Sequence, residues 1–225
     1  MEKSYSIAID GPSASGKSTV AKIIANKLNF IYVDTGAMYR AFTYAVLKAG
    51  LDPKDEKASE SLIGKIEISF NENNHITLDG VDISKEVRSN EVADNVSYIA
   101  SYKNIRLFLV DSQRKIASNK NVVMDGRDIG TYVLSNADLK IYQIASAEER
   151  ANRRYKENIE KGIKSSYEDC LNNVNKRDYI DSHRSFCPLH PADDSIEINT
   201  THMTIDEVVN EILKIAKERG IYWCR

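Results

Sequence analysis

The sequence has few of the features that stabilise secreted proteins or anchor proteins in membranes. Of its 225 residues only three are cysteine, Cys170, Cys187 and Cys224, and they form no CxxC pair. This spacing argues against a disulfide framework or a zinc knuckle and favours a reducing compartment. No apolar run approaches the roughly 20 residues of a membrane span, and the first residues lack an apolar leader. We therefore expect a cytoplasmic protein that binds no membrane.

The sequence also lacks an excess of either charge. Lysine and arginine total 31, aspartate and glutamate total 33, and the formal net charge is -2. A nearly neutral chain does not bind nucleic acid along its whole surface, and the sequence has no platform of basic and aromatic residues for stacking single strands. Hydrophobic residues make up 42%, so the chain can bury a substantial core. Its length fits one large domain, or a core with a smaller insert.

Strand and helix patterns alternate along most of the chain. Short apolar runs that end in turn residues alternate with segments whose apolar residues recur at helical spacing. The runs expected to be strands cover residues 5–9, 30–33, 122–124, 139–144 and 195–198. Helices are expected from near Lys17, over 36–48 and over 104–118. Because parallel strands need helical crossovers of this kind, the pattern predicts an α/β fold with a doubly wound parallel five-stranded sheet.

Three further helices are predicted from capping boxes, in which a serine or threonine precedes a glutamate by three residues. The pairs are Ser146 with Glu149, Ser165 with Glu168, and Thr204 with Glu207.

The middle of the chain follows a different pattern. Ile66, Ile68 and Phe70 alternate with polar residues, a polar turn follows, and Ile76 and Leu78 alternate again. This is typical of a hairpin with one solvated face, unlike a buried parallel sheet. A helical stretch follows near 90–100. We therefore expect residues 62–100 to form a small β-rich inserted domain, within a core made of residues 1–61 and 101–225.

Residues 11–18 match the phosphate-loop pattern G-x-x-x-x-G-K-[ST] at every fixed position. The alternative, a glycine-rich turn that only joins strand to helix, is disfavoured because the motif directly follows a strand and runs into an amphipathic helix. The residues expected to bind ATP here are Gly11, Pro12, Ser13, Ala14, Ser15, Gly16, Lys17, Ser18 and Thr19. Lys17 can bridge the β- and γ-phosphates, and the Ser18 hydroxyl can ligate Mg²⁺.

Several arginines lie where they could bind further phosphates: Arg40, Arg127, Arg153, Arg154, Arg177 and Arg184. Arg127 is the strongest candidate because it follows a strand directly, between Asp125 and Asp128, and ligands of open α/β sheets bind beyond the carboxyl ends of strands. The sequence has no H-R-D-x-x-x-x-N loop to deprotonate a hydroxyl acceptor. A phosphate acceptor needs no such base, since it is mostly dianionic at pH 7. The residues therefore favour a phosphate-bearing acceptor.

Four motifs together resemble the bacterial cytidylate kinases, a family of P-loop nucleoside monophosphate kinases. They are I-D-G-P-S-A-S-G-K-S-T at 9–19, D-T-G-A-M-Y-R at 34–40, D-G-R-D-I-G-T at 125–131 and R-D-x-x-D-x-x-R at 177–184. The resemblance implies direct in-line transfer of the γ-phosphate of ATP to CMP or dCMP, with Mg²⁺. It also implies a monomer that binds small molecules, a monophosphate-binding insert and a helical lid over about 150–166.

The resemblance also implies roles for individual residues. Lys17, Arg127 and Arg177 would be catalytic, and Arg153 and Arg154 would bind ATP from the lid. The monophosphate nucleotide would be bound by Thr35, Arg40, Ser97, Arg106, Arg127, Asp128, Arg177, Asp181 and Arg184. Asp128 can accept from the cytosine amino group, whereas uracil has a carbonyl there that a carboxylate would repel. The chain departs from the family at Asn199, where many relatives have aspartate, and at Cys187, where a small apolar residue is common.

Two other functions fit parts of the sequence. Residues 175–178 match the N-K-x-D motif of GTP-dependent switch proteins, but they follow a polar helical segment, and no aspartate has glycine three residues later. The second alternative is another small-molecule P-loop kinase, acting on UMP or shikimate. The four histidines show no metal-ligand spacing, and we expect them to lie at the surface.

Overall fold

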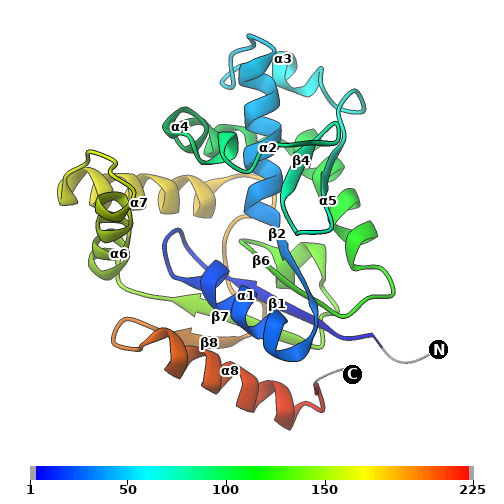
Figure 1. Ribbon diagram of the computed structural model, residues 1–225, viewed down its shortest axis with the longest axis vertical. Helices are drawn as coiled ribbons and strands as arrows, with labels where there is room; N and C mark the ends of the chain where they lie inside the picture. Colours follow the sequence, from blue (N-terminus) through cyan, green and yellow to red (C-terminus); the bar gives the residue numbers. More distant parts are fainter. Residues whose placement is uncertain (1–3, 223–225) are drawn as a thin grey trace. The chain divides into compact units, whose positions relative to one another are not determined.

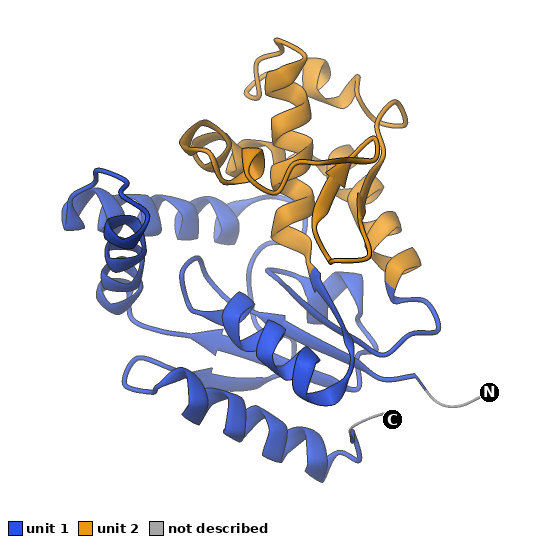
Figure 2. Cartoon of the chain, viewed as in Figure 1, with its two compact units in different colours: residues 1–33, 117–225 blue, residues 34–116 orange. Residues whose placement is uncertain are grey.

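The computed structural model describes residues 4–222, so Cys224 and the first three residues lie outside the described part. The chain divides into two compact units, coloured separately in Figure 2. The first unit comprises residues 1–33 and 117–225, and the second comprises residues 34–116. The expected insert, residues 62–100, therefore lies inside a larger second unit that begins at the last residue of the second strand, Asp34.

The first unit is built on a five-stranded sheet of order β2-β6-β1-β7-β8 (Figure 1). Its strands are β1 (Ser6–Asp10), β2 (Ile31–Asp34), β6 (Val122–Gly126), β7 (Leu139–Ile144) and β8 (Ile196–Asn199). β1 pairs in parallel with β6 and with β7, and β7 pairs in parallel with β8. The predicted α/β fold with a five-stranded parallel sheet is confirmed.

Helices cover the sheet because its strands are apolar on both faces. Ile7 and Ile9 pack in one cluster with α1 (Lys17–Leu28) and α8 (Ile205–Glu218), while Ala8, pointing the other way, is also fully buried. Two more helices, α6 (Ala147–Glu160) and α7 (Tyr167–His183), pack against each other, and a π-helical turn, η2 (Ile129–Val133), follows β6.

The second unit has its own core around α2 (Thr35–Lys48). A three-stranded antiparallel sheet, β3 (Ile68–Phe70), β4 (Ile76–Leu78) and β5 (Val81–Asp82), forms at the predicted hairpin. The remaining elements of this unit are α3 (Glu56–Glu60), the 3₁₀ turn η1 (Glu86–Arg88), α4 (Asn90–Ile99) and α5 (Lys103–Ala117).

The capping predictions are partly right. Thr204 and Glu207 form the predicted box at α8. Ser146 does cap α6, but the Glu149 side chain pairs with Arg153 instead of returning to the cap. The box predicted at Ser165 and Glu168 was wrong by one residue: Ser166 and Asp169 form it. Both serines have an acid three residues later, and the hydroxyl of Ser165 is instead used by Asn158.

In the part of the chain that the structure describes, no helix is both long enough and apolar enough to cross a membrane. All four histidines, His75, His183, His190 and His202, are exposed, as predicted.

Candidate active site

The phosphate loop joins β1 to α1 in a conformation that only glycine allows at its ends. Gly11 has φ 154°, and a Cβ there would lie 2.1 Å from the backbone oxygen of Gln143 on β7. Gly16 is left-handed, with φ 88°, at the start of α1. The glycines therefore let the loop lie flat against β7 while its backbone turns into the helix. This leaves the free N–H groups of the α1 N-terminus at the loop.

Lys17 is buried beneath this loop, and its Nζ donates to the carbonyl of Pro12 at 3.1 Å. Burial, followed by the nearby positive charge of Arg127, lowers the pKa of Lys17 to about 7. A buried ammonium among arginines is a poor arrangement unless an anion joins them. The loop is therefore electrostatically prepared for phosphate.

The Ser18 hydroxyl lies beside a carboxylate, as a magnesium site requires. Ser18 Oγ donates to Asp125 Oδ2 at 2.6 Å, and the Tyr32 hydroxyl donates to Asp125 Oδ1 at 2.8 Å. Asp125 stands at the carboxyl end of β6. Among residues 4–222 no three acidic, histidine or cysteine side chains form a metal-binding group. Since Mg²⁺ commonly takes one or two protein oxygens, with phosphates and water completing its shell, Ser18 and Asp125 fit this ion.

Arg127 and Asp181 form a largely buried ion pair next to the loop. Arg127 Nε lies 2.8 Å from Asp181 Oδ2, which joins the end of β6 to α7. Burial alone would raise the pKa of Asp181, but the charges of Arg127, Arg177 and Arg184 outweigh it and lower the pKa. Arg177 lies four residues before Asp181 on α7, one helical turn away, and its charge contributes to lowering the pKa values of both Lys17 and Asp181. The three predicted catalytic residues thus share one electrostatic site in the first unit.

Asp128 lies in a turn that Asp10 holds in place. The backbone N–H groups of Ile129 and Gly130 donate to the two carboxylate oxygens of Asp10, at 2.8 and 2.7 Å. Burial raises the pKa of Asp10 to about 6. Asp128 itself is buried, and Arg184 Nη2 lies 3.7 Å from its Oδ1. The turn therefore presents a buried carboxylate next to an arginine, which is an arrangement suited to reading a polar ligand edge.

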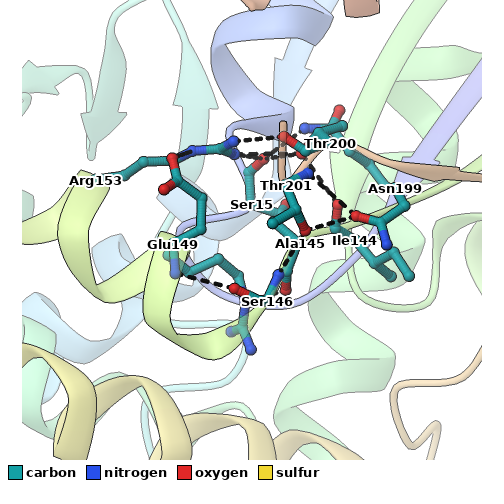
Figure 3. A network of polar contacts seen from close by, with 11 residues as sticks. Ser15, Ile144, Ala145, Ser146, Glu149, Arg153, Asn199, Thr200 and Thr201 are labelled. Atoms are coloured by element: carbon teal, nitrogen blue, oxygen red, sulfur yellow. Dashed lines mark hydrogen bonds and ion pairs between the residues drawn. The ribbon is translucent and has the colours of Figure 1, made fainter. Parts of the chain in front are cut away.

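Of the two predicted lid arginines, Arg153 and Arg154, one contacts a carbonyl group of the phosphate loop. Arg153 donates to the Ser15 carbonyl at 2.9 Å and to the Thr200 carbonyl at 2.7 Å, and it pairs with Glu149 (Figure 3). Arg154 points elsewhere and pairs with Glu157 at 3.7 Å. Of the two predicted lid arginines, only Arg153 therefore contacts the loop in this structure.

The other predicted binding residues lie in the second unit. Asp34 caps α2 through Ala37 and pairs with Arg40 at 3.0 Å, while Thr35 is buried beside it. Arg106 on α5 is almost fully buried, donates to the Ala100 carbonyl at 2.8 Å, and lies over the Tyr39 ring. Ser97 on α4 is buried too. Thr35, Ser97 and Arg106 are thus buried within this unit, while Arg40 is partly exposed and is held by its ion pair with Asp34.

Sequence reasoning missed three side chains of the site. Asp10 holds the Asp128 turn, Arg150 donates to the Ser13 carbonyl at 3.1 Å, and Gln143 donates to the Ser15 carbonyl at 2.6 Å. Helical spacing could have indicated Arg150, which precedes Arg153 by three residues on α6. Nothing in the sequence indicates Gln143, whose partner is more than 100 residues away.

Comparisons with known proteins show the family of this chain. Residues 7–218 match the family model described as cytidylate kinase. The chain belongs to the cytidylate kinase family. A cytidylate kinase of Leuconostoc mesenteroides is 49% identical, covering 94% of this chain and 96% of that protein. One from Bacillus subtilis is 45% identical, covering 98% and 100%. An uncharacterised Eubacterium ventriosum protein of known structure, 15% identical with a TM-score of 0.50 and coverage of 95% and 98%, shares the fold.

The position of the N-K-x-D match argues against the alternative of a GTP-dependent switch protein, in agreement with the family. Residues 175–178 lie in the middle of α7, whereas a guanine-reading motif should follow a buried strand. The departure at Asn199 is also explained locally. Its side-chain oxygen accepts from the N–H and the hydroxyl of Thr201, at 3.1 and 2.6 Å. The amide oxygen of asparagine can therefore accept both hydrogen bonds at the end of β8, and no carboxylate is needed there.

Proposed function

We propose that this member of the cytidylate kinase family transfers the γ-phosphate of ATP to CMP and dCMP by direct in-line displacement. The observation that carries the proposal is the concentration of positive charge at the phosphate loop, from buried Lys17 and from half-buried Arg127 and Arg177. ATP and a nucleoside monophosphate are both polyanions, and they repel each other unless positive charge neutralises them. Phosphoryl transfer needs little covalent chemistry from the protein, so positioning and charge neutralisation supply most of the catalysis.

ATP is proposed to bind through residues 11–19. The backbone N–H groups of the loop and of the α1 N-terminus donate to its phosphates, and Lys17 contacts the β- and γ-phosphates. Arg153 and Arg154 are proposed to reach ATP from the region of residues 150–166. In this role Arg153 exchanges its present carbonyl partners for phosphate oxygens. A lid that excludes water limits wasteful hydrolysis of ATP.

Mg²⁺ is proposed to be held by Ser18, with Asp125 beside it. When bound, the ion neutralises charge on the phosphates of ATP. Asp125 fixes the Ser18 hydroxyl, and Tyr32 in turn fixes Asp125 through its second oxygen.

The acceptor is proposed to be the phosphate dianion of the monophosphate. Its second pKa is near 6, so about 90% of it is ionised at pH 7 and no general base is required. Arg127 and Arg177 are proposed to bind the phosphates, and Asp181, paired with Arg127, to bind the ribose together with Arg177. Further contacts with the monophosphate nucleotide are proposed for Arg184, Thr35, Arg40, Ser97 and Arg106.

Asp128 is proposed to select cytosine. Its carboxylate can accept from the cytosine amino group, and it would repel the carbonyl that uracil carries at the same place. The Asp128→Ala variant should therefore lose preference for CMP over UMP, measured as the ratio of the two kcat/KM values. An unchanged ratio would remove Asp128 from base reading.

The proposed function is tested by a coupled ADP-release assay with ATP, Mg²⁺ and a panel of acceptors: CMP, dCMP, UMP, AMP, GMP and shikimate. Turnover should be greatest with CMP and dCMP. Greatest turnover with shikimate or UMP would favour another P-loop kinase activity. We propose further that the protein works as a monomer in the cytoplasm; sedimentation should then give the mass of a single 25.4 kDa chain.

A further inference from the structure

Gln143 is a buried polar residue that the proposed function does not use. It lies on β7 and is 1% exposed. Its Nε2 donates to the Ser15 carbonyl at 2.6 Å, and its backbone oxygen lies where a Cβ on Gly11 would need to be. One residue of the central sheet thus contacts both the first and the fifth residue of the phosphate loop.

The Ser15 carbonyl matters because it shares a rigid peptide unit with the N–H of Gly16. In a planar trans peptide the C=O and the N–H point in opposite directions. Holding the Ser15 oxygen against Gln143 therefore directs the Gly16 N–H away from β7. Backbone N–H groups of this loop are the groups that bind phosphate. The orientation of this one peptide decides whether Gly16 can donate to ATP.

Two other donors share the Ser15 oxygen, at longer distances than Gln143. Arg153 Nη1 is 2.9 Å away and Thr200 Oγ1 is 3.5 Å away. Arg153 lies on α6, is 28% exposed, and divides its guanidinium between Ser15, Thr200 and Glu149, as Figure 3 shows. If Arg153 leaves for the phosphates of ATP, the carbonyl keeps its shortest hydrogen bond, to Gln143.

We infer that Gln143 is a positioning residue for ATP binding: it fixes the Ser15–Gly16 peptide so that Gly16 faces the phosphates while Arg153 moves between the Ser15 carbonyl and ATP. This inference rests on the proposed function, because the movement of Arg153 toward ATP is part of that proposal.

The arrangement has a cost that makes the inference testable. Gln143 Oε1 is buried, and within residues 4–222 it has no hydrogen-bond partner. A buried acceptor without a partner destabilises the folded state. Leucine at this position would remove that atom, and the Ser15 carbonyl would still have Arg153 and Thr200. Gln143→Leu should therefore fold at least as stably as the wild type while binding ATP less well.

The test compares Gln143→Leu with the wild type by steady-state kinetics, by calorimetry with a non-hydrolysable ATP analogue, and by thermal unfolding. The KM for ATP and the Kd of the analogue should rise about 2- to 12-fold, the equivalent of one hydrogen bond. The KM for CMP should not rise with them, and the melting temperature should not fall. The matched control is Gln113→Leu: Gln113 is buried on α5, and its amide has no hydrogen-bond partner in the described chain. This control should leave the KM for ATP unchanged.

Unchanged ATP affinity in Gln143→Leu would overturn the inference. A lowered melting temperature with equal rises in both KM values would overturn it too, because that result describes a purely structural residue. Gln143→Met, which keeps the unbranched side chain, provides the same comparison if the leucine variant does not fold. A wild-type protein that binds the analogue but never phosphorylates CMP would refute the proposed function alone, since calorimetry tests Gln143 without the acceptor.

Discussion

At the scale of single residues, the site combines groups whose ordinary charge states are disfavoured by burial. Lys17 and Asp10 are both buried near the phosphate loop, and burial moves their pKa values toward neutrality, to about 7 and about 6. Such groups destabilise an empty site, and they become favourable when a ligand or a backbone donor compensates their charge.

Replacing Lys17 by alanine should reduce kcat about 10²- to 10³-fold, because one preorganised donor to the transferred phosphoryl group is lost. Thermal unfolding should show a correctly folded protein, since the substitution also removes a desolvated charge. Lys22→Ala is the matched control, because Lys22 is exposed on the same helix. Near-normal turnover of folded Lys17→Ala would contradict the role of Lys17.

Asp10 should make stability depend on pH in the acid range. Because its pKa is raised from 3.8 to about 6 in the folded protein, the folded state keeps a proton there that the unfolded chain has lost. The contribution of Asp10 to stability is therefore present below pH 4 and is lost as the pH rises through 6, by roughly 3 kcal/mol in all.

Urea unfolding of the wild type and of Asp10→Asn at a series of pH values measures this contribution. Relative to Asp10→Asn, the wild type should lose unfolding free energy as the pH rises from 4 to 7, and the difference between the two proteins should be constant above pH 7. A difference that does not vary with pH would show that the Asp10 carboxyl titrates normally.

At the scale of elements, local chemistry determined most of what the sequence could predict. The loop at residues 11–18 was recognisable because its glycines, its lysine and its strand–helix context are all close together in the sequence. The start of α7 was not: Ser165 and Ser166 offer the same capping chemistry, and only packing around Asn158 selects Ser166. Gln143 and Asp10 escaped prediction because their partners are 128 and about 120 residues distant.

The capping box of α8 gives a prediction for a single element. Thr204→Ala should destabilise the first unit by about 1 kcal/mol, because the N–H of Glu207 loses its acceptor. Glu207→Gln should cost less, since an amide oxygen can still accept from Thr204. Chemical denaturation of the two variants provides the comparison, and equal losses would show that the ionic charge of Glu207 dominates.

At the scale of the whole molecule, each unit has a separate hydrophobic cluster. The cluster of the first unit gathers side chains from the sheet, α1 and α8, while the cluster of the second lies around α2, α4 and α5. The sequence indicated a division of this kind through the hairpin pattern near residue 70. It could not indicate that α2 belongs with the second cluster, since a helix that follows a strand looks the same in either unit.

Because the two clusters are separate, we expect the two units to unfold locally in separate steps. Leu109→Ala removes a fully buried side chain from the second cluster and should cost about 2–5 kcal/mol. Hydrogen–deuterium exchange should then accelerate in α2, α4 and α5 and not in β1 or β6. Ile212→Ala, on α8, should give the reverse pattern. Faster exchange in every element for both variants would show one cooperative unit instead of two.

The second unit begins at Asp34, the last residue of β2, and ends at Ile116, before β6, and β2 and β6 are neighbours in the sheet. Residues 34–116 therefore form one continuous segment, here called the cassette, that connects the edge strand β2 to its neighbour β6. Laboratory recombination could exchange this cassette between related kinases without cutting the phosphate loop, its supporting strands β1 and β7, or the helix that begins at Lys17. The architecture thus separates residues 34–116, which carry Thr35, Arg40, Ser97 and Arg106 for the proposed acceptor, from the part of the chain that carries the phosphate loop.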